Sequence, residues 1–199
     1  MRAIVVFFGM IASGKSTLAE RFADRHDLLY LNTDRVRKEL AGLAATERRP
    51  DGIGQGIYTA EFTRRTYSAM LERARVELAR GRGVVLDGSY ADRQERARVI
   101  DCAGLAARFI LCTCSDEIVR RRLAIRSRDP QAVSDGRWEI YLHQKESFIW
   151  PDELEPSQLL LLDTEDTPDH LLARVEVWLK KKSTQGQPAG GGGNAPSAT

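Results

Sequence analysis

The residues with the clearest chemical potential lie between positions 9 and 17, after an apolar run and before an amphipathic one. They form a P-loop, the phosphate-binding pattern of two glycines separated by four residues and followed by Lys and Ser. Gly9 allows a tight turn, and Gly14 lets the backbone approach a phosphate without a Cβ in the way. The N–H groups between them can point inward as an anion nest, which the positive end of the next helix reinforces. We therefore expect nucleotide phosphates to be held by nine consecutive residues, Gly9, Met10, Ile11, Ala12, Ser13, Gly14, Lys15, Ser16 and Thr17.

Three side chains in or near this loop predict phosphoryl chemistry with a metal ion. Lys15 is expected to reach the β- and γ-phosphates as a catalytic residue, and the Ser16 hydroxyl to take one position on Mg²⁺. Asp87 ends the otherwise apolar run at residues 83–87. A carboxylate there needs a partner, and a hydrated cation is the obvious one, with a purely structural Asp87 as the alternative. The sequence therefore predicts ATP and Mg²⁺ as bound species.

Asp34 follows a short apolar run at residues 28–32 and is our candidate for orienting an attacking hydroxyl group. At the mouth of a strand its carboxylate can accept the proton of the acceptor or hydrogen-bond its hydroxyl. The alternative is that Asp34 only caps a helix that begins at Arg35. Arg37, one helical turn further on, is expected to hold an anionic group of the acceptor, with solvated surface as its alternative.

Five arginines gather between positions 120 and 128. Arg122 and Arg126 are four residues apart and share a helical face, where like charges repel each other unless an anion lies between them. The phosphates of a nucleotide would supply that anion, so both arginines are candidate catalytic residues. The alternative is a solvated basic face, and the sequence leaves open which of the five arginines enters a site.

The segments that must position these residues alternate between strand-like and helix-like patterns, which is typical of a parallel sheet with helices on both faces. An α/β three-layer sandwich with five strands is expected, at residues 3–8, 28–32, 83–87, 107–114 and 159–163. Helices are expected at residues 15–25, 35–40, 59–80, 92–103, 115–128, 136–150 and from 167 onward. Ligands bind outside the carboxyl ends of the strands in such sheets, and the first three strands end at Gly9, near Asp34 and at Asp87.

Composition limits the class of protein. With 199 residues, 42% of them hydrophobic, the chain fits one globular domain over residues 1–182, followed by an uncharged, Gly-rich and disordered tail at 183–199. A balance of 30 basic and 28 acidic residues argues against a protein that mainly coats nucleic acid. Three cysteines beside apolar runs are expected to be buried thiols, not a zinc site. The apolar N-terminus is too short for a signal peptide or a membrane span, so we expect a cytoplasmic protein.

Three separated motifs resemble the small P-loop kinases: the P-loop, the run at residues 32–40, and Asp87 followed by Arg93 and Arg96. The resemblance is to predicted kinases of the AAA-type ATPase-like family, some of them fused to aminoglycoside-phosphotransferase-like domains. Gluconate kinase and the kinase domain of phage polynucleotide kinase are more distant. The resemblance covers about residues 2–180. The run at residues 87–90, Asp-Gly-Ser-Tyr, departs from the Asp-Ala-Thr-Phe usual in the nearest relatives, which blurs the substrate assignment.

The resemblance implies a P-loop NTPase fold whose P-loop strand is central in the sheet, and a kinase domain at residues 1–182. It also implies that the arginine-rich segment is a lid, that Asp87 supports Mg²⁺ through water or by way of Ser16, and that Arg93 and Arg96 help to bind the substrate. A closing lid would exclude water that could otherwise hydrolyse ATP.

Three functions are consistent with these observations. The leading one is an ATP-dependent kinase that phosphorylates a hydroxyl of a small molecule, acting as a monomer or dimer. The second is a polynucleotide 5′-hydroxyl kinase, which the near-zero net charge and the lack of an aromatic and basic stripe disfavour. The third is a nucleotide-binding switch or ATPase without an acceptor, which Asp34 and the arginine cluster disfavour. The loop at residues 44–56 is expected to help select the acceptor.

Overall fold

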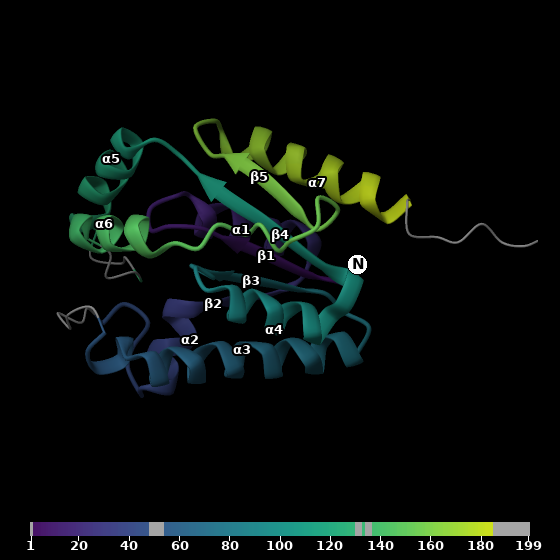
Figure 1. Cartoon of the computed structure of the whole chain (residues 1–199), viewed down its shortest axis with the longest axis horizontal. Helices are drawn as coiled ribbons and strands as arrows, with labels where there is room; N and C mark the ends of the chain where they lie inside the picture. Colours follow the sequence, from purple (N-terminus) through teal and green to yellow (C-terminus); the bar gives the residue numbers. More distant parts are fainter. Residues whose placement is uncertain (1, 48–53, 130–132, 134–136, 185–199) are drawn as a thin grey trace, which may run out of the picture.

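Strand β1 (Ile4–Phe8) lies at the centre of a five-stranded, all-parallel sheet with the order β2-β3-β1-β4-β5 (Figure 1). The other strands are β2 (Leu29–Asn32), β3 (Val84–Gly88), β4 (Ala107–Thr113) and β5 (Leu159–Asp163). The structure is a computed structural model that describes residues 2–47, 54–129, 133 and 137–184. The expected α/β sandwich with a central P-loop strand is confirmed.

The alternating side chains of β1 explain why this strand is central. All five residues are fully buried, so both faces of the strand must be covered. Val5 and Phe7 pack on one face against α1 (Lys15–His26) and α7 (Pro168–Thr184). Residues 4, 6 and 8 pack on the other face against α3 (Ala60–Ala79) and α4 (Arg93–Ala103). The apolar run in the sequence thus becomes the core of two helix layers.

The remaining helices lie toward the carboxyl edge of the sheet. Helix α2 (Thr33–Leu40) follows β2 directly, while α5 (Asp116–Ser127) and α6 (Trp138–Ser147) form a separate pair at the left of Figure 1. Short 3₁₀ turns occur at Gly56–Tyr58 and Gly104–Ala106. The strand register aligns Phe7 with Asp87, and Asp87 with Asn32, so the chemistry-bearing ends of three strands meet at one edge.

Several element ends differ from those expected. Helix α2 begins at Thr33 because the Asn32 side chain accepts the Arg35 N–H, so Asp34 is not the cap. Helix α6 ends at Ser147, three residues before the expected end. Helix α7 continues to Thr184, two residues into the tail expected at 183–199, and the rest of that tail lies outside the described residues, as do residues 48–53 of the expected loop. The division into domain and tail stays a prediction.

Two further expectations concern the cysteines and membranes. Cys112 is buried and its pKa is raised by that burial, whereas Cys102 and Cys114 are only half-buried. In the described ranges, no three His, Cys, Asp or Glu side chains gather as a metal cluster would require. Among the helices of those ranges, none combines the length and apolarity of a membrane span.

Candidate functional site

The P-loop joins β1 to α1, and its backbone path requires glycine at both ends. Gly9 has a φ of 135°, and a Cβ there would collide with the carbonyl oxygen of Cys112 on β4. Gly14 has a φ of 87°, and a Cβ there would come within 3.1 Å of the Arg122 and Thr164 side chains. Both positions therefore combine a left-handed backbone with close packing, which only glycine accommodates without rearrangement.

The loop presents an anion nest. The N–H groups of Gly14, Lys15 and Ser16 make no hydrogen bond within the described part of the chain, and they lie at the N-terminal end of α1. The first turn of α1 carries no acidic side chain that would offset the positive end of the helix. The Lys15 ammonium folds back over the loop and donates to the Met10 carbonyl at 3.2 Å. A bound anion would meet several backbone donors and one ammonium group.

Asp87 fits a role in supporting a hydrated cation. It is fully buried, and its Oδ2 accepts hydrogen bonds from the Tyr30 hydroxyl at 2.7 Å and the Asn32 amide at 2.5 Å. Among the residues that the structure describes, its Oδ1 has no hydrogen-bond partner. A buried carboxylate oxygen without a partner is costly, and a hydrated Mg²⁺ beside Ser16 would satisfy it. Burial and the neighbouring Asp87 charge raise the pKa of Tyr30, so Tyr30 stays a neutral donor.

Asp34 lies with Lys15 and Ser16 on the wall of a cavity of about 250 Å³ between α1 and the start of α2. Because Asn32 caps α2, capping does not explain why a carboxylate stands at position 34. Asp34 is half-buried and faces the side of the P-loop from which Lys15 projects. The cavity thus brings together an ammonium group that could bind a phosphate, a hydroxyl that could ligate a metal ion and a carboxylate that can accept a proton.

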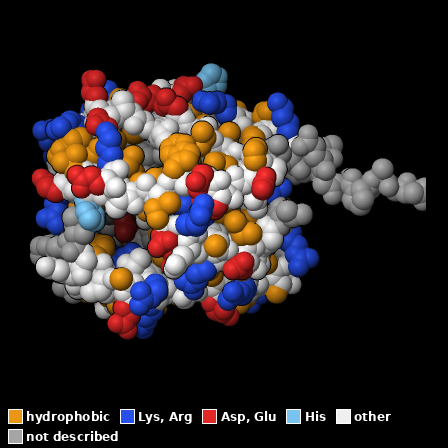
Figure 2. Space-filling model, in the orientation of Figure 1, with side chains coloured by type: hydrophobic (Ala, Val, Ile, Leu, Met, Phe, Trp, Pro, Cys, Tyr) orange, Lys and Arg blue, Asp and Glu red, His pale blue; other side chains and the backbone are white. Residues whose placement is uncertain are grey.

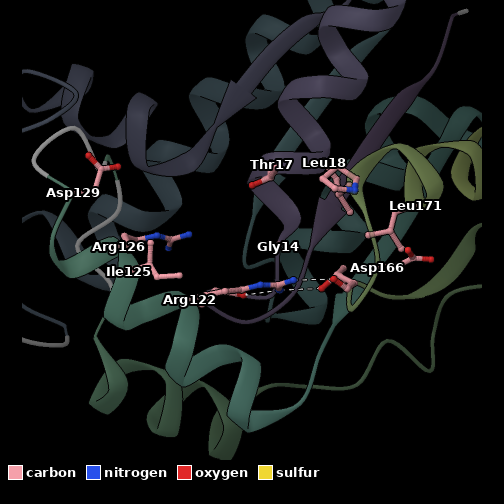
Figure 3. Close-up of a pocket in the computed structure, with 12 residues that line it drawn as sticks. Gly14, Thr17, Leu18, Arg122, Ile125, Arg126, Asp129, Asp166 and Leu171 are labelled. Atoms are coloured by element: carbon pink, nitrogen blue, oxygen red, sulfur yellow. Dashed lines mark hydrogen bonds between the residues drawn. The ribbon is translucent and has the colours of Figure 1, made fainter.

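A second cavity, of about 450 Å³, lies on the other side of the loop between α1, α5 and the segment that joins β5 to α7 (Figure 3). Arg122 crosses it and donates to the Ala12 carbonyl at 3.1 Å, the Thr164 hydroxyl at 3.0 Å and the Thr164 carbonyl at 2.8 Å. Apolar residues such as Leu18 and Leu171 line part of its wall, and the charged residues Arg126, Asp129 and Asp166 line another part. A space of this size beside the anion nest suits a nucleoside.

Arg126 lines both cavities, whereas Arg122 lines only the larger one. In Figure 3 both side chains extend from α5 into the cavity, Arg126 toward the space below Thr17 and Arg122 past Gly14 toward the segment after β5. Arg122 and Arg126 therefore lie on the same face of α5, as their spacing predicts. Their catalytic role stays a prediction.

Three arginines expected to bind substrate have other partners. Arg37 is buried and donates to the Ile57 carbonyl and the Thr63 hydroxyl. Arg96 has a fully buried side chain that pairs with Glu153 and donates to the Tyr90 carbonyl. Arg93 is exposed and pairs with Asp152 and Glu153. None of the three lines either of the two cavities, and we do not retain them in the proposed acceptor site.

Some residues at the site were missed by sequence reasoning. Thr164 directly follows β5, so the rule that ligands lie beyond strand ends would have found it. Tyr30 and Asn32 support Asp87 from β2, where their alternation with buried Leu31 was a weak signal. Gln144 on α6 accepts a hydrogen bond from the Ile11 N–H, and nothing in the local sequence pattern indicated this contact.

Comparison with known proteins gives one family and several similar folds. Residues 4–149 match the family model described as an AAA domain. Uncharacterised proteins of Mycobacterium tuberculosis and Mycobacterium bovis are 34% identical over 89 residues, which is 45% of this chain and 18% of each relative. The match thus spans less than a fifth of the length of those relatives.

Solved structures share the fold at low identity. A sugar kinase from Janibacter sp. HTCC2649 has a TM-score of 0.68 at 21% identity, covering 89% of this chain and 94% of that one. A gluconokinase from Sinorhizobium meliloti 1021 has a TM-score of 0.62 at 18% identity, with 92% and 94% covered. Kti12 from Chaetomium thermophilum in complex with ADP-AlF3 has a TM-score of 0.60 at 15% identity, with 87% and 97% covered. All three show the likeness of fold.

Proposed function

The chain belongs to the AAA domain family, and from this premise we propose that it is an ATP-dependent kinase that phosphorylates a hydroxyl group of a small molecule. The observation that carries the proposal is the cavity that places Asp34 on one wall with Lys15 and Ser16. A nucleotide switch needs the phosphate loop and a metal ligand, but it has no need of a carboxylate facing a separate cavity beside them. The sugar kinase and gluconokinase folds support the same class of reaction.

The proposed roles follow from position. The anion nest and Lys15 hold the phosphates, and the base occupies the larger cavity beside Arg122. Mg²⁺, where bound, neutralises charge on the phosphates, and Ser16 and Asp87 are the residues that would hold it. Asp34 accepts the proton of the acceptor hydroxyl. At the same time the hydroxyl oxygen bonds to the γ-phosphorus, and the bond between the γ-phosphorus and ADP breaks. Arg126, which lines both cavities, stabilises the charge that moves between them.

Two other functions remain as alternatives. An ATPase or switch without an acceptor is favoured by the likeness to Kti12, which was solved with ADP-AlF3. A polynucleotide kinase is disfavoured by the charge distribution. On the face drawn in Figure 2, basic and acidic side chains are interspersed, whereas a groove that tracks a nucleic-acid strand would gather basic ones.

The test pairs an acceptor screen with one variant. ATP consumption is first measured over sugars, sugar acids, nucleosides, aminoglycosides and oligonucleotides with a free 5′-hydroxyl. Asp34→Asn should then lower single-turnover transfer to the acceptor by roughly two to four powers of ten, the range of general acid–base assistance. Affinity for a fluorescent ATP analogue should hardly change, because the nucleotide contacts lie in the loop at 9–17. Asp101→Asn, which makes the same change on an exposed part of α4, is the matched control.

Each outcome of this experiment discriminates between functions. Selective loss of transfer in Asp34→Asn supports the kinase. Loss of transfer and ATP affinity together indicates a nucleotide-site or folding effect, and loss of neither removes Asp34 from the mechanism. If no small molecule stimulates ATP consumption but an oligonucleotide does, the acceptor class is wrong. If nothing does, the ATPase or switch is the better assignment.

A further inference from the structure

Gln144 contacts the P-loop from a helix that the sequence places far away. Its Oε1 accepts a hydrogen bond from the Ile11 N–H at 2.7 Å across 133 residues of sequence. The assignment of the amide oxygen is forced, because a backbone N–H can only donate. Ile11 is buried and Gln144 is half-buried. The contact therefore fixes the carboxamide group of Gln144 against the first half of the phosphate loop.

The NH2 group of Gln144 is left as an unused donor beside that loop. A carboxamide is planar, so once its oxygen is bound at Ile11 its nitrogen is held close to the same backbone. Within the described part of the chain the NH2 group makes no hydrogen bond. A polar group fixed at one end and unpartnered at the other is suited to a ligand that arrives later.

The Gln144 contact lies at the end of the loop where a terminal phosphate would be. The Lys15 ammonium, which reaches the β- and γ-phosphates in P-loops, lies against the Met10 carbonyl, next to Ile11. The larger cavity, suited to the nucleoside, lies beside Ala12, Gly14 and Thr17, further along the loop than Ile11. From base to terminal phosphate, the nucleotide would therefore run toward the end that Gln144 contacts.

Helix α6, which carries Gln144, is tied to α5. The Asp116 carboxylate at the start of α5 accepts hydrogen bonds from the Tyr141 hydroxyl at 2.6 Å and from the Lys145 ammonium at 2.8 Å. The Arg120 guanidinium stacks 3.6 Å from the centroid of the Trp138 ring. Because these contacts join α5 and α6, a ligand held by Gln144 would also affect the position of the arginines of α5.

We propose that Gln144 is a nucleotide-sensing residue of the proposed kinase site, an inference that rests on ATP being the bound nucleotide. Its carboxamide oxygen holds the Ile11 N–H while its NH2 group donates to the terminal phosphoryl group of ATP. ADP lacks that group, so Gln144 distinguishes the two nucleotides. Through α6 the distinction is passed to the arginine-bearing helix α5.

The experiment measures the ratio of the affinities for a non-hydrolysable ATP analogue and for ADP, both with Mg²⁺, by titration calorimetry on the full chain. Gln144→Leu should reduce this ratio roughly ten- to a hundredfold, the range for one hydrogen bond to a charged group. Gln144→Glu keeps an acceptor for the Ile11 N–H but removes the donor and faces the phosphate with a negative charge. It should reduce the ratio at least as far, with an unchanged melting temperature. Glu146→Gln, on the exposed side of α6, is the matched control and should keep the wild-type ratio.

The outcomes separate this inference from the proposed function. Equal losses of ATP-analogue and ADP affinity in both Gln144 variants, which leave the ratio unchanged, would reduce Gln144 to a structural contact. Unchanged affinities for both nucleotides would overturn its role entirely. If the wild-type protein binds both nucleotides but phosphorylates no acceptor, only the kinase proposal fails and the ratio still decides the role of Gln144. If it binds neither nucleotide, both proposals fail.

Discussion

Replacing Arg122 by Met should destabilise the protein even without any ligand. The guanidinium group binds three oxygen acceptors on two separate segments, the P-loop at Ala12 and the segment after β5 at Thr164. Each hydrogen bond contributes about 1 kcal/mol net, and Arg122 is only half-buried, so water can replace part of what is lost. We expect the free energy of unfolding to fall by about 2–3 kcal/mol, while Met keeps the apolar packing of the side-chain stem.

The assay is thermal unfolding of the ligand-free protein. For a chain of this size, a loss of about 2–3 kcal/mol lowers the melting temperature by roughly 4–12 °C. Arg122→Lys should recover only part of the loss, because one ammonium group cannot reproduce the planar fork that reaches both segments. Arg128→Met is the matched control: Arg128 is exposed after the end of α5, and its loss should shift the melting temperature by less than about 1–2 °C.

Two results would refute the reasoning. A melting temperature for Arg122→Met within the range of Arg128→Met would mean that the three hydrogen bonds do not hold the two segments together in solution. If Arg122→Lys kept the wild-type melting temperature, the positive charge alone would account for the stabilisation, and the planar fork of the guanidinium would not be needed.

Three further predictions follow from the site and its surroundings. Lys15→Met should abolish nearly all phosphoryl transfer without loss of stability, measured as single-turnover rate and melting temperature; normal turnover would remove the P-loop from the mechanism. Ser16→Ala and Asp87→Asn should each raise the Mg²⁺ concentration for half-maximal rate roughly 10- to 100-fold, and an unchanged Mg²⁺ dependence in both would give Asp87 another role. Burial acts to raise the pKa of Glu153, but the hydrogen bonds from Arg96 hold that pKa below its usual value. The pair of Arg96 and Glu153 therefore stabilises the fold above about pH 4.3, and its contribution is lost as the pH falls through the lowered pKa. Melting curves from pH 7 to 3 should show the deficit of Glu153→Gln shrinking toward the acid end; a deficit independent of pH would assign it to packing.

The sheet and its helices could be predicted because their causes are local. Apolar runs such as residues 4–8 are buried on both faces, because a strand with only apolar side chains needs a central position in the sheet. The carboxyl-edge rule also placed Asp87 correctly beside the P-loop strand, since parallel register brings the ends of neighbouring strands together. The start of α2 was missed by two residues because Asn32 was assigned to the strand alone, although it is also a strong N-cap residue.

The partners of long side chains could not be predicted, because they come from distant segments. Arg96 stands on α4 close after Asp87, which made it a candidate for substrate, yet its partner Glu153 lies 57 residues further along. A buried arginine requires an anion, but the sequence alone does not say whether the protein or a ligand supplies it. The contact of Gln144 with Ile11 has the same origin, since the path between α5 and α6 decides which residue of α6 meets the loop.

The structure also bears on which arginine of α5 would move when a nucleotide binds. Arg122 already donates to Ala12 and Thr164, so a movement of its side chain toward a phosphate would first break those hydrogen bonds. The free energy of those hydrogen bonds would then reduce the free energy of nucleotide binding. Arg126 lines both cavities from the next turn of the helix and reaches the smaller one, beside Lys15, where transfer is proposed. Arg122 is therefore suited to hold the P-loop in shape, and the position of Arg126 on both cavities suits the role proposed for it during transfer. An arginine that fixes the loop in the empty state still assists catalysis, because a loop that is already formed pays no ordering cost when the phosphates arrive.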